Sequence, residues 1–206
     1  MLSKLWRQRS SAPRKAKPIF VVSGLPRSGT SMMMKMLSEG GLEIVTDAVR
    51  AADEDNPDGY FEFEPVKQLA EGQDAWLEAA RGKLVKVISA LLEHLPRKCE
   101  YKVVFMEREI GEILASQHKM LKRRNEASGA SDAEMSNQFR EHLHASKYWL
   151  ARQPNMSVLY VDYNKLMADP DAYCQAVADF LGADLDVARM RSVPNARLYR
   201  NRAPGP

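Results

Sequence analysis

The sequence predicts a three-layer α/β fold, in which a central sheet of parallel strands is flanked by helices. Short apolar runs rich in valine alternate along the chain with longer runs of helical periodicity, a pattern typical of parallel strands joined by right-handed helical crossovers. The first strand leads directly into a glycine-containing loop and a helix. In such folds ligands bind at the carboxyl ends of the strands, so we expect the functional site at that edge of the sheet.

The first half of the predicted fold holds two strands and two helices. Residues 19–23 are a continuous apolar run, which predicts a buried strand, and a helix over 32–38 ends at the glycine pair that begins with Gly40. A second helix is predicted over 65–82, because a proline stands at its first turn and a glycine at its end. The valine- and isoleucine-rich run at 84–89 predicts the second strand.

A strand and two helices follow. The run at 101–106 predicts a strand, and apolar residues at helical spacing over 109–121 predict the helix directly after it. Ser131 and Glu134 have the spacing of a capping box, which predicts that a long helix begins there and extends to about Gln153.

The last strand and helix have equally local signals. The apolar run at 156–161 predicts a fourth strand. Asp169 followed by proline predicts the start of a helix, and Gly182 predicts its end. The polar stretch 122–132 between the two preceding helices is either a mobile lid or a solvated connector.

Length and composition are those of one globular domain. At 206 residues, with 45% hydrophobic and 28% charged residues, the chain can bury a core without disulfides or a structural metal. Its two cysteines, Cys99 and Cys174, lie far apart and in no metal-binding pattern, which is typical of a reducing compartment. We therefore expect a cytoplasmic protein. No apolar run approaches the roughly 20 residues of a membrane-spanning helix, so we expect no transmembrane segment.

The first 17 residues differ in charge from the rest of the chain. They carry six basic residues and no acidic one, whereas residues 18–206 carry 24 basic and 27 acidic residues. We interpret 1–17 as a basic, flexible N-terminal arm in front of a single domain over 18–206. Leu2, Leu5 and Trp6 are at helical spacing, so weak contact with a membrane surface or a targeting role is an alternative for the arm. A nucleic acid is not an expected partner.

Residues 24–31 (GLPRSGTS) have the spacing of a phosphate-binding loop between a strand and a helix. Glycines allow backbone N–H groups to turn towards a phosphate, and the helix N-terminus adds partial positive charge. Thr30 stands where nucleotide triphosphatases have a lysine, and the cation of this loop, Arg27, comes two residues before Gly29. The loop therefore predicts a P-loop-like fold that binds phosphate. An ordinary turn is the structural alternative.

The segment PIFVVSGLPRSGTSMM at 18–33 resembles the 5′-phosphosulfate loop of sulfotransferases, which use 3′-phosphoadenosine 5′-phosphosulfate (PAPS) as the sulfuryl donor. The arginine version of the loop (PRSGT) is similar to that of tyrosylprotein sulfotransferases and many bacterial relatives. The resemblance implies that the 5′ end of the donor is bound by five consecutive residues: Arg27, Ser28, Gly29, Thr30 and Ser31. It also implies that Arg27 faces the transferring group.

A second signature lies at the end of the predicted third strand. The run YKVVFMER ends in Arg108, and Ser116 follows eight residues later on the next predicted helix. In sulfotransferases an arginine and a serine at this spacing contact the 3′-phosphate, so the resemblance assigns that role to Arg108 and Ser116. Arginine can bind phosphate bidentately, which is consistent with the assignment. Without the first loop, the pair would be read as an ordinary surface arginine and helix serine.

The end of the chain is basic. Residues 189–202 contain five arginines and no acidic residue. In sulfotransferases a basic C-terminal segment folds over the nucleotide, so the resemblance implies that Arg197, Tyr199 and Arg200 close the site. A disordered tail is the alternative.

Two residues are implied in the transfer step in addition to Arg27. The stretch DNPDGYFEFE at 55–64 resembles the N-P-x-G-Y-F-E segment of many bacterial sulfotransferases, and Glu62 within it is our candidate for the general base. Lys86 matches a lysine that many relatives carry at the end of the corresponding strand, although a surface-facing strand residue is the alternative. If Glu62 is not the base, another acid or His118 is. The four histidines have no partners at metal-ligand spacing, so we expect no metal.

These features predict a PAPS-dependent sulfotransferase. It would transfer a sulfuryl group to a hydroxyl or amine acceptor and release adenosine 3′,5′-bisphosphate (PAP). Two alternatives stay open: a nucleotide or small-molecule kinase that uses the loop with ATP, and a sulfotransferase-like protein that binds nucleotide without turnover. The acceptor is not identified by the sequence.

Overall fold

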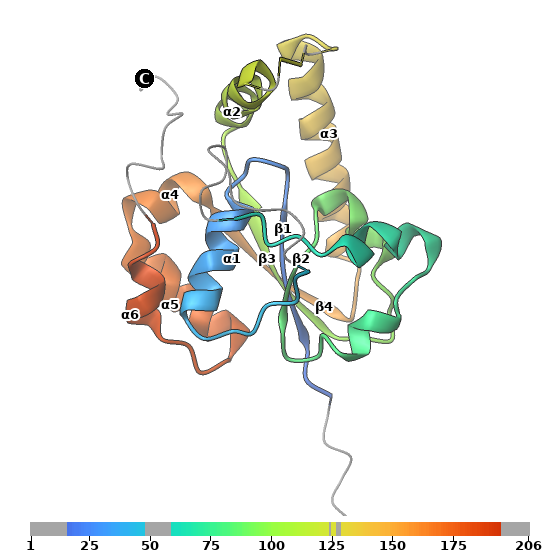
Figure 1. Ribbon diagram of the computed structural model, residues 1–206, viewed down its shortest axis with the longest axis vertical. Helices are drawn as coiled ribbons and strands as arrows, with labels where there is room; N and C mark the ends of the chain where they lie inside the picture. Colours follow the sequence, from blue (N-terminus) through green and yellow to red (C-terminus); the bar gives the residue numbers. More distant parts are fainter. Residues whose placement is uncertain (1–15, 48–58, 124, 127–128, 195–206) are drawn as a thin grey trace, which may run out of the picture.

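The computed structural model describes residues 16–47, 59–123, 125–126 and 129–194, and within them the predicted α/β layers are confirmed (Figure 1). The sheet has four parallel strands in the order β2-β1-β3-β4. The strands are β1 (Ile19–Gly24), β2 (Leu84–Lys86), β3 (Tyr101–Glu107) and β4 (Met156–Asp162). No helix in the described parts of the chain is long and apolar enough to cross a membrane.

Alternating side chains of the central strands supply two cores, one on each face of the sheet. Phe20 and Val22 of β1 contribute to the core on one face, whereas Ile19 and Val21 contribute to the core on the other. All six residues of β1 are buried, which explains why its sequence reads as a continuous apolar run rather than as an alternation of polar and apolar residues.

Helices α1 (Thr30–Glu39), α4 (Tyr163–Ala168), α5 (Pro170–Leu181) and α6 (Val187–Arg191) cover one face (Figure 1). The other face is covered by three 3₁₀ helices, η1 (Glu64–Glu71), η2 (Ala75–Glu78) and η3 (Ser89–His94), and by the end of α3 (Asp132–Leu150). Helix α2 (Ile110–Arg123) follows β3 and lies beside α3 above the carboxyl edge of the sheet (Figure 1).

Local capping signals explain where two of the helices begin or end. Helix α3 begins with the predicted capping box, in which the Ser131 side chain accepts a hydrogen bond from the Glu134 backbone N–H and the Glu134 carboxylate accepts one from the Ser131 backbone N–H. Asp169 caps α5, and Gly182 ends it in a left-handed conformation. The predictions for these two helices are confirmed.

The prediction of one helix over 65–82 is wrong. The chain forms η1 and η2 instead, separated at Gly72, which has a positive φ of 77° and donates its N–H to carbonyls of the last turn of η1. The apolar side chains keep their spacing because Val66, Leu69 and Leu77 all enter the same core. Apolar residues three positions apart lie on one face of a 3₁₀ helix as well as of an α-helix, so this spacing did not distinguish the two.

The end of one strand and the presence of two short helices also differ from what the sequence predicted. Strand β2 ends at Lys86, and the remainder of the predicted strand leads into η3. Helices α4 and α6 were not predicted at all, because each is only five or six residues long and begins with an aspartate cap that also suits a turn. Most of these differences lie in short elements, whose formation depends on packing more than on local sequence.

The strand order places a topological switch point between β1 and β3. From β1 the chain crosses to β2 on one side, and from β3 it crosses to β4 on the other. Adjacent connections that leave in opposite directions open a crevice at the carboxyl ends of the two strands. Gly24 at the end of β1 pairs in register with Met106 near the end of β3. The loop after β1 and the start of α2 therefore lie at the same edge.

Candidate functional site

The loop after β1 has a backbone conformation that requires glycine at its first position. Gly24 has φ 144°, and a Cβ atom there would lie 2.6 Å from the Met106 carbonyl oxygen and 2.6 Å from Ser28 Oγ. The Ser28 hydroxyl donates a 2.7 Å hydrogen bond to the carbonyl of Leu25, across the turn. Arg27 has φ 69°, a left-handed conformation that costs free energy for any residue with a side chain. The loop is thus a tight, strained turn.

The second glycine of the loop is covered by an aromatic ring. Gly29 has φ 98°, and a Cβ atom added to it would lie 2.4 Å from Cδ2 of Tyr163, the first residue of α4. Helix α1 then begins at Thr30, directly after Gly29. The loop is therefore packed between the end of β3 and the start of α4, and it leads into a helix whose N-terminal N–H groups face the site.

Lys86 reaches this loop from the end of β2. Its Nζ atom donates a 3.1 Å hydrogen bond to Ser31 Oγ and a 2.9 Å bond to the carbonyl of Tyr60. The ammonium group is consequently placed against the first turn of α1, which disagrees with the alternative of a surface-facing strand residue. Through Tyr60 the same lysine contacts the segment that carries Glu62.

Three of the residues predicted to bind the donor meet at one point. The Nε atom of Arg27 donates a 2.9 Å hydrogen bond to Ser116 Oγ, and Nη1 of Arg108 donates a 3.2 Å bond to the Arg27 carbonyl. The Ser116 side chain is buried in the second turn of α2. Two guanidinium groups and a hydroxyl therefore lie together where β1 and β3 end, an arrangement suited to a multiply charged anion.

A buried acidic residue that sequence reasoning missed supports Arg108. Glu112, on the first turn of α2, accepts a 2.9 Å hydrogen bond from Arg108 Nε, and the two side chains are 1% and 8% exposed respectively. Asn164 of α4 donates a 2.9 Å bond to the other carboxylate oxygen. The Arg108 guanidinium also lies 4.4 Å from the ring centroid of Tyr163. The four-residue spacing of Arg108 and Glu112 at the start of the predicted helix was the available sequence signal.

Glu62 lies on the segment that Lys86 contacts through the carbonyl of Tyr60. Its side chain is half-buried, and its backbone carbonyl accepts a 2.9 Å hydrogen bond from Thr46 Oγ1. The neighbouring Glu64 N–H donates to an Asp47 carboxylate oxygen at 2.6 Å. These two bonds hold the backbone of the segment that carries Glu62 against residues 46–47. Neither of them involves the Glu62 carboxylate.

The remaining candidates are His118 and three residues near the end of the chain. His118, the alternative base, forms a 2.9 Å ion-pair contact with Asp132 at the start of α3. Arg197, Tyr199 and Arg200 lie outside the described residues. So do parts of the stretch 122–132, whose described ends belong to α2 and to the cap of α3.

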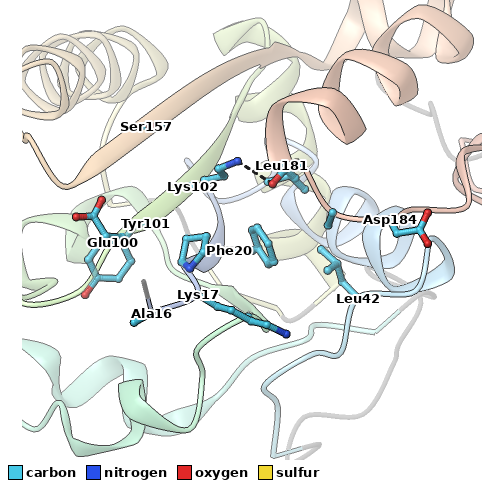
Figure 2. A pocket seen from close by; sticks show the side chains of 14 residues that line it. Ala16, Lys17, Phe20, Leu42, Glu100, Tyr101, Lys102, Ser157, Leu181 and Asp184 are labelled. Carbon is cyan, nitrogen blue, oxygen red and sulfur yellow. Dashed lines mark hydrogen bonds between the residues drawn. The ribbon is translucent and has the colours of Figure 1, made fainter. Parts of the chain in front are cut away.

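A cavity of about 720 Å³ lies at the opposite edge of the sheet, at the amino ends of the strands (Figure 2). Phe20 and Tyr101 form part of its wall, with Lys17 at the rim, and burial raises the pKa of the Tyr101 hydroxyl. Lys102 donates hydrogen bonds of 3.0 and 2.8 Å to the carbonyls of Phe180 and Leu181 at the end of α5, one of which is drawn in Figure 2. None of the predicted site residues lines this cavity, so it is separate from the phosphate loop.

Known structures share this fold. The chain is similar to mouse sulfotransferase SULT7A1, solved in complex with PAP, with a TM-score of 0.56 and 14% sequence identity over 91% of this chain and 68% of that one. It is also similar to the sulfotransferase domain of the Synechococcus PCC 7002 olefin synthase, with a TM-score of 0.51 and 15% identity over 97% of this chain and 87% of that one. At these identities the likeness shows the fold. A search of curated proteins found no sequence match.

The sequence itself was compared with models of protein families. Residues 17–201, which include the phosphate loop, Arg108 and Ser116, match the model of the sulfotransferase domain. The match covers most of the chain and agrees with the four-stranded parallel sheet and with the position of the loop after its first strand. The chain therefore belongs to the sulfotransferase domain family.

Proposed function

We propose that this protein transfers a sulfuryl group from PAPS to a hydroxyl or amine acceptor and releases PAP. The observation that carries the proposal is the convergence of Arg27, from the loop after β1, with Arg108 and Ser116, from the segment after β3, at the carboxyl edge of the sheet. PAPS differs from ATP by its 3′-phosphate, and a donor of this kind needs a second anion site close to the loop that holds the 5′ end. The family match supports the same reaction class.

The 5′ end of the donor is assigned to the loop residues Arg27, Ser28, Gly29, Thr30 and Ser31. The positive φ angles of this loop support the assignment, since they turn backbone N–H groups inwards at the N-terminus of α1. A Cβ atom at Gly24 or Gly29 would meet other protein atoms within 3 Å, so the turn that carries these N–H groups forms only with glycine at both positions.

The 3′-phosphate is assigned to Arg108 and Ser116. A guanidinium and a buried hydroxyl can together bind a dianion through charge-assisted hydrogen bonds. Arg197, Tyr199 and Arg200 are assigned, by resemblance alone, to a segment that closes over the nucleotide. The arginine loop leads us to place the protein with the tyrosylprotein and bacterial types of the family.

The transfer itself requires in-line positioning, positive charge beside the departing oxygen and a base for the acceptor proton. The acceptor oxygen or nitrogen forms a bond to sulfur, and the bond between sulfur and the 5′-phosphate oxygen breaks. Arg27 and Lys86 are assigned to stabilise the negative charge that develops on PAP, and Lys86 is positioned for this by its bonds to Ser31 and Tyr60. Glu62 is assigned to accept the proton. No metal takes part in this scheme.

The rest of the chain is assigned by its sequence. We propose a single domain over 18–206 that works in the cytoplasm and binds no nucleic acid, preceded by a basic arm over 1–17 that can contact an anionic membrane surface weakly.

Calorimetric titration with PAP, 5′-AMP, ADP and ATP-Mg²⁺ tests the donor site. We expect tight binding that depends on the 3′-phosphate, followed by acceptor-dependent release of PAP when PAPS is supplied with a panel of hydroxyl and amine acceptors. Preference for ATP-Mg²⁺ would favour a kinase. Binding of PAP without turnover of PAPS on any acceptor would favour a non-catalytic protein.

A further inference from the structure

Glu112 is among the most deeply buried charged groups in the described part of the chain. Only 2% of the residue is exposed, although it lies in the first turn of α2, at the carboxyl edge of the sheet. Removing a carboxylate from water is costly, and a buried ion pair contributes little net stability compared with apolar residues of the same size. A buried carboxylate at this position therefore calls for an explanation other than stability.

Both oxygens of this carboxylate have an assigned donor. Oε2 accepts from Arg108 Nε at 2.9 Å, and Oε1 accepts from Asn164 Nδ2 at 2.9 Å. Arg108 and Glu112 lie at the junction of β3 and α2, whereas Asn164 belongs to α4, which follows β4. The carboxylate consequently links the two chain segments that leave neighbouring strands, and it cannot rotate without breaking a bond.

The Arg108 guanidinium is held from three directions. Glu112 contacts its Nε edge, the Tyr163 ring lies 4.4 Å from its face, and its Nη1 atom donates to the carbonyl of Arg27. Tyr163 also covers Gly29 of the phosphate loop. The cluster formed by Arg108, Glu112, Tyr163 and Asn164 therefore fixes the guanidinium plane relative to the loop before any nucleotide binds.

We propose that Glu112 is the positioning residue that sets the direction of the Arg108 guanidinium and thereby the selectivity of the nucleotide site for a 3′-phosphate, with Asn164 holding the carboxylate in place. Arginine binds phosphate through a planar fork, so its affinity depends on the orientation of that plane as well as on its charge. The inference rests on the proposed function, because it assumes that Arg108 contacts the 3′-phosphate.

The Glu112→Gln variant separates this role from simple space filling. Glutamine has the same shape, and its carbonyl can accept from Arg108 while its amide faces Asn164, whose side chain can rotate to present an acceptor. The packing and the hydrogen bond to Nε are retained, but the acceptor loses its negative charge, so the bond that orients the guanidinium is weakened. Glu109→Gln is the matched control, since Glu109 is exposed and lies three residues earlier in the same chain segment.

Calorimetry on the full chain measures the dissociation constant for 5′-AMP divided by that for PAP, which is the preference of the site for the 3′-phosphate. We expect Glu112→Gln to lower this ratio about tenfold, as for other residues that orient a ligand-binding side chain, with 5′-AMP affinity unchanged and the Glu109→Gln ratio equal to that of the unmodified protein. Glu112→Asp keeps the negative charge, but its side chain is one methylene shorter and its carboxylate lies farther from Arg108. We therefore expect this variant to lower the ratio as well. If Glu112→Gln does not fold, Glu112→Asp decides.

Two outcomes would overturn the inference while leaving the proposed function in place. One is an unchanged ratio in both Glu112 variants. The other is an equal loss of affinity for 5′-AMP and PAP, which would show that Glu112 only supports the structure of the site. An unmodified protein that binds 5′-AMP and PAP equally would instead contradict the proposed function, and the inference with it.

Discussion

Arg27 donates a hydrogen bond from Nε to the hydroxyl of Ser116, at 2.9 Å, across 89 residues of chain. One residue belongs to the loop after β1 and the other to the helix after β3. They meet because β1 and β3 are parallel neighbours whose ends pair in register, Gly24 with Met106. In the proposed function, the contact joins the group assigned to the 5′ end of the donor to a group assigned to its 3′-phosphate.

Ser116→Ala tests the hydroxyl. We expect the affinity for PAP to fall about two- to tenfold, the cost of one hydrogen bond at a buried site, and the affinity for 5′-AMP to fall less, although the hydroxyl also accepts a bond from Arg27 of the loop. Calorimetry with both nucleotides measures the effect. Ser136→Ala, on the body of α3 and away from the loop, is the control. Equal losses for the two nucleotides would contradict the assignment of Ser116 to the 3′-phosphate.

Gly29→Ala tests the contact between the phosphate loop and α4. Gly29 and Gly41 both have positive φ, 98° and 108°, but a Cβ atom at Gly29 would lie 2.4 Å from the Tyr163 ring, whereas one at Gly41 would meet nothing within 4 Å. We expect backbone strain of about 1–3 kcal/mol in each alanine variant, and a further loss of stability and of PAP binding only at Gly29. Urea unfolding and calorimetry measure the two effects. Equal losses of stability in the two variants would mean that the ring yields without cost.

Lys86→Met tests the cation at the end of β2. Methionine retains an unbranched apolar side chain as far as Cε but removes the ammonium group and its bonds to Ser31 and Tyr60. We expect turnover of PAPS to fall by about 10² or more, as when one charge-stabilising donor is removed from an active site, with a smaller effect on PAP binding. Lys83→Met is the control, since Lys83 pairs with the exposed Glu43 before β2 begins. Turnover that survives in Lys86→Met would remove Lys86 from the transfer step.

Glu62→Gln tests the proposed base. We expect normal binding of the donor and a loss of turnover of about 10²–10⁴, the usual contribution of a positioned general base. Glu64→Gln is the matched control, because Glu64 is exposed and forms a surface ion pair with Lys67. Rates with the best acceptor from the panel give the comparison. If Glu62→Gln retains full activity, His118 becomes the next residue to test.

The patterns that predicted the fold correctly were local ones. The continuous apolar run of β1, the Ser131 and Glu134 capping box of α3, and the Gly182 stop of α5 each depend on residues within a few positions of one another. The helix predicted over 65–82 failed because apolar spacing alone does not distinguish an α-helix from 3₁₀ turns. The interruption at Gly72 is decided by how the segment packs on the sheet.

For the site, the sequence alone determined that a loop with the spacing of a phosphate-binding loop stands between the first strand and the first helix, and that Arg108 and Ser116 follow a later strand. It could not determine what these residues touch. Strand order and helix packing decide three contacts of the site. These are the bond from Lys86 to Ser31, the Tyr163 ring against Gly29, and the buried Glu112 beside Arg108. Such contacts depend on the relative placement of whole elements, and only the tertiary structure decides that placement.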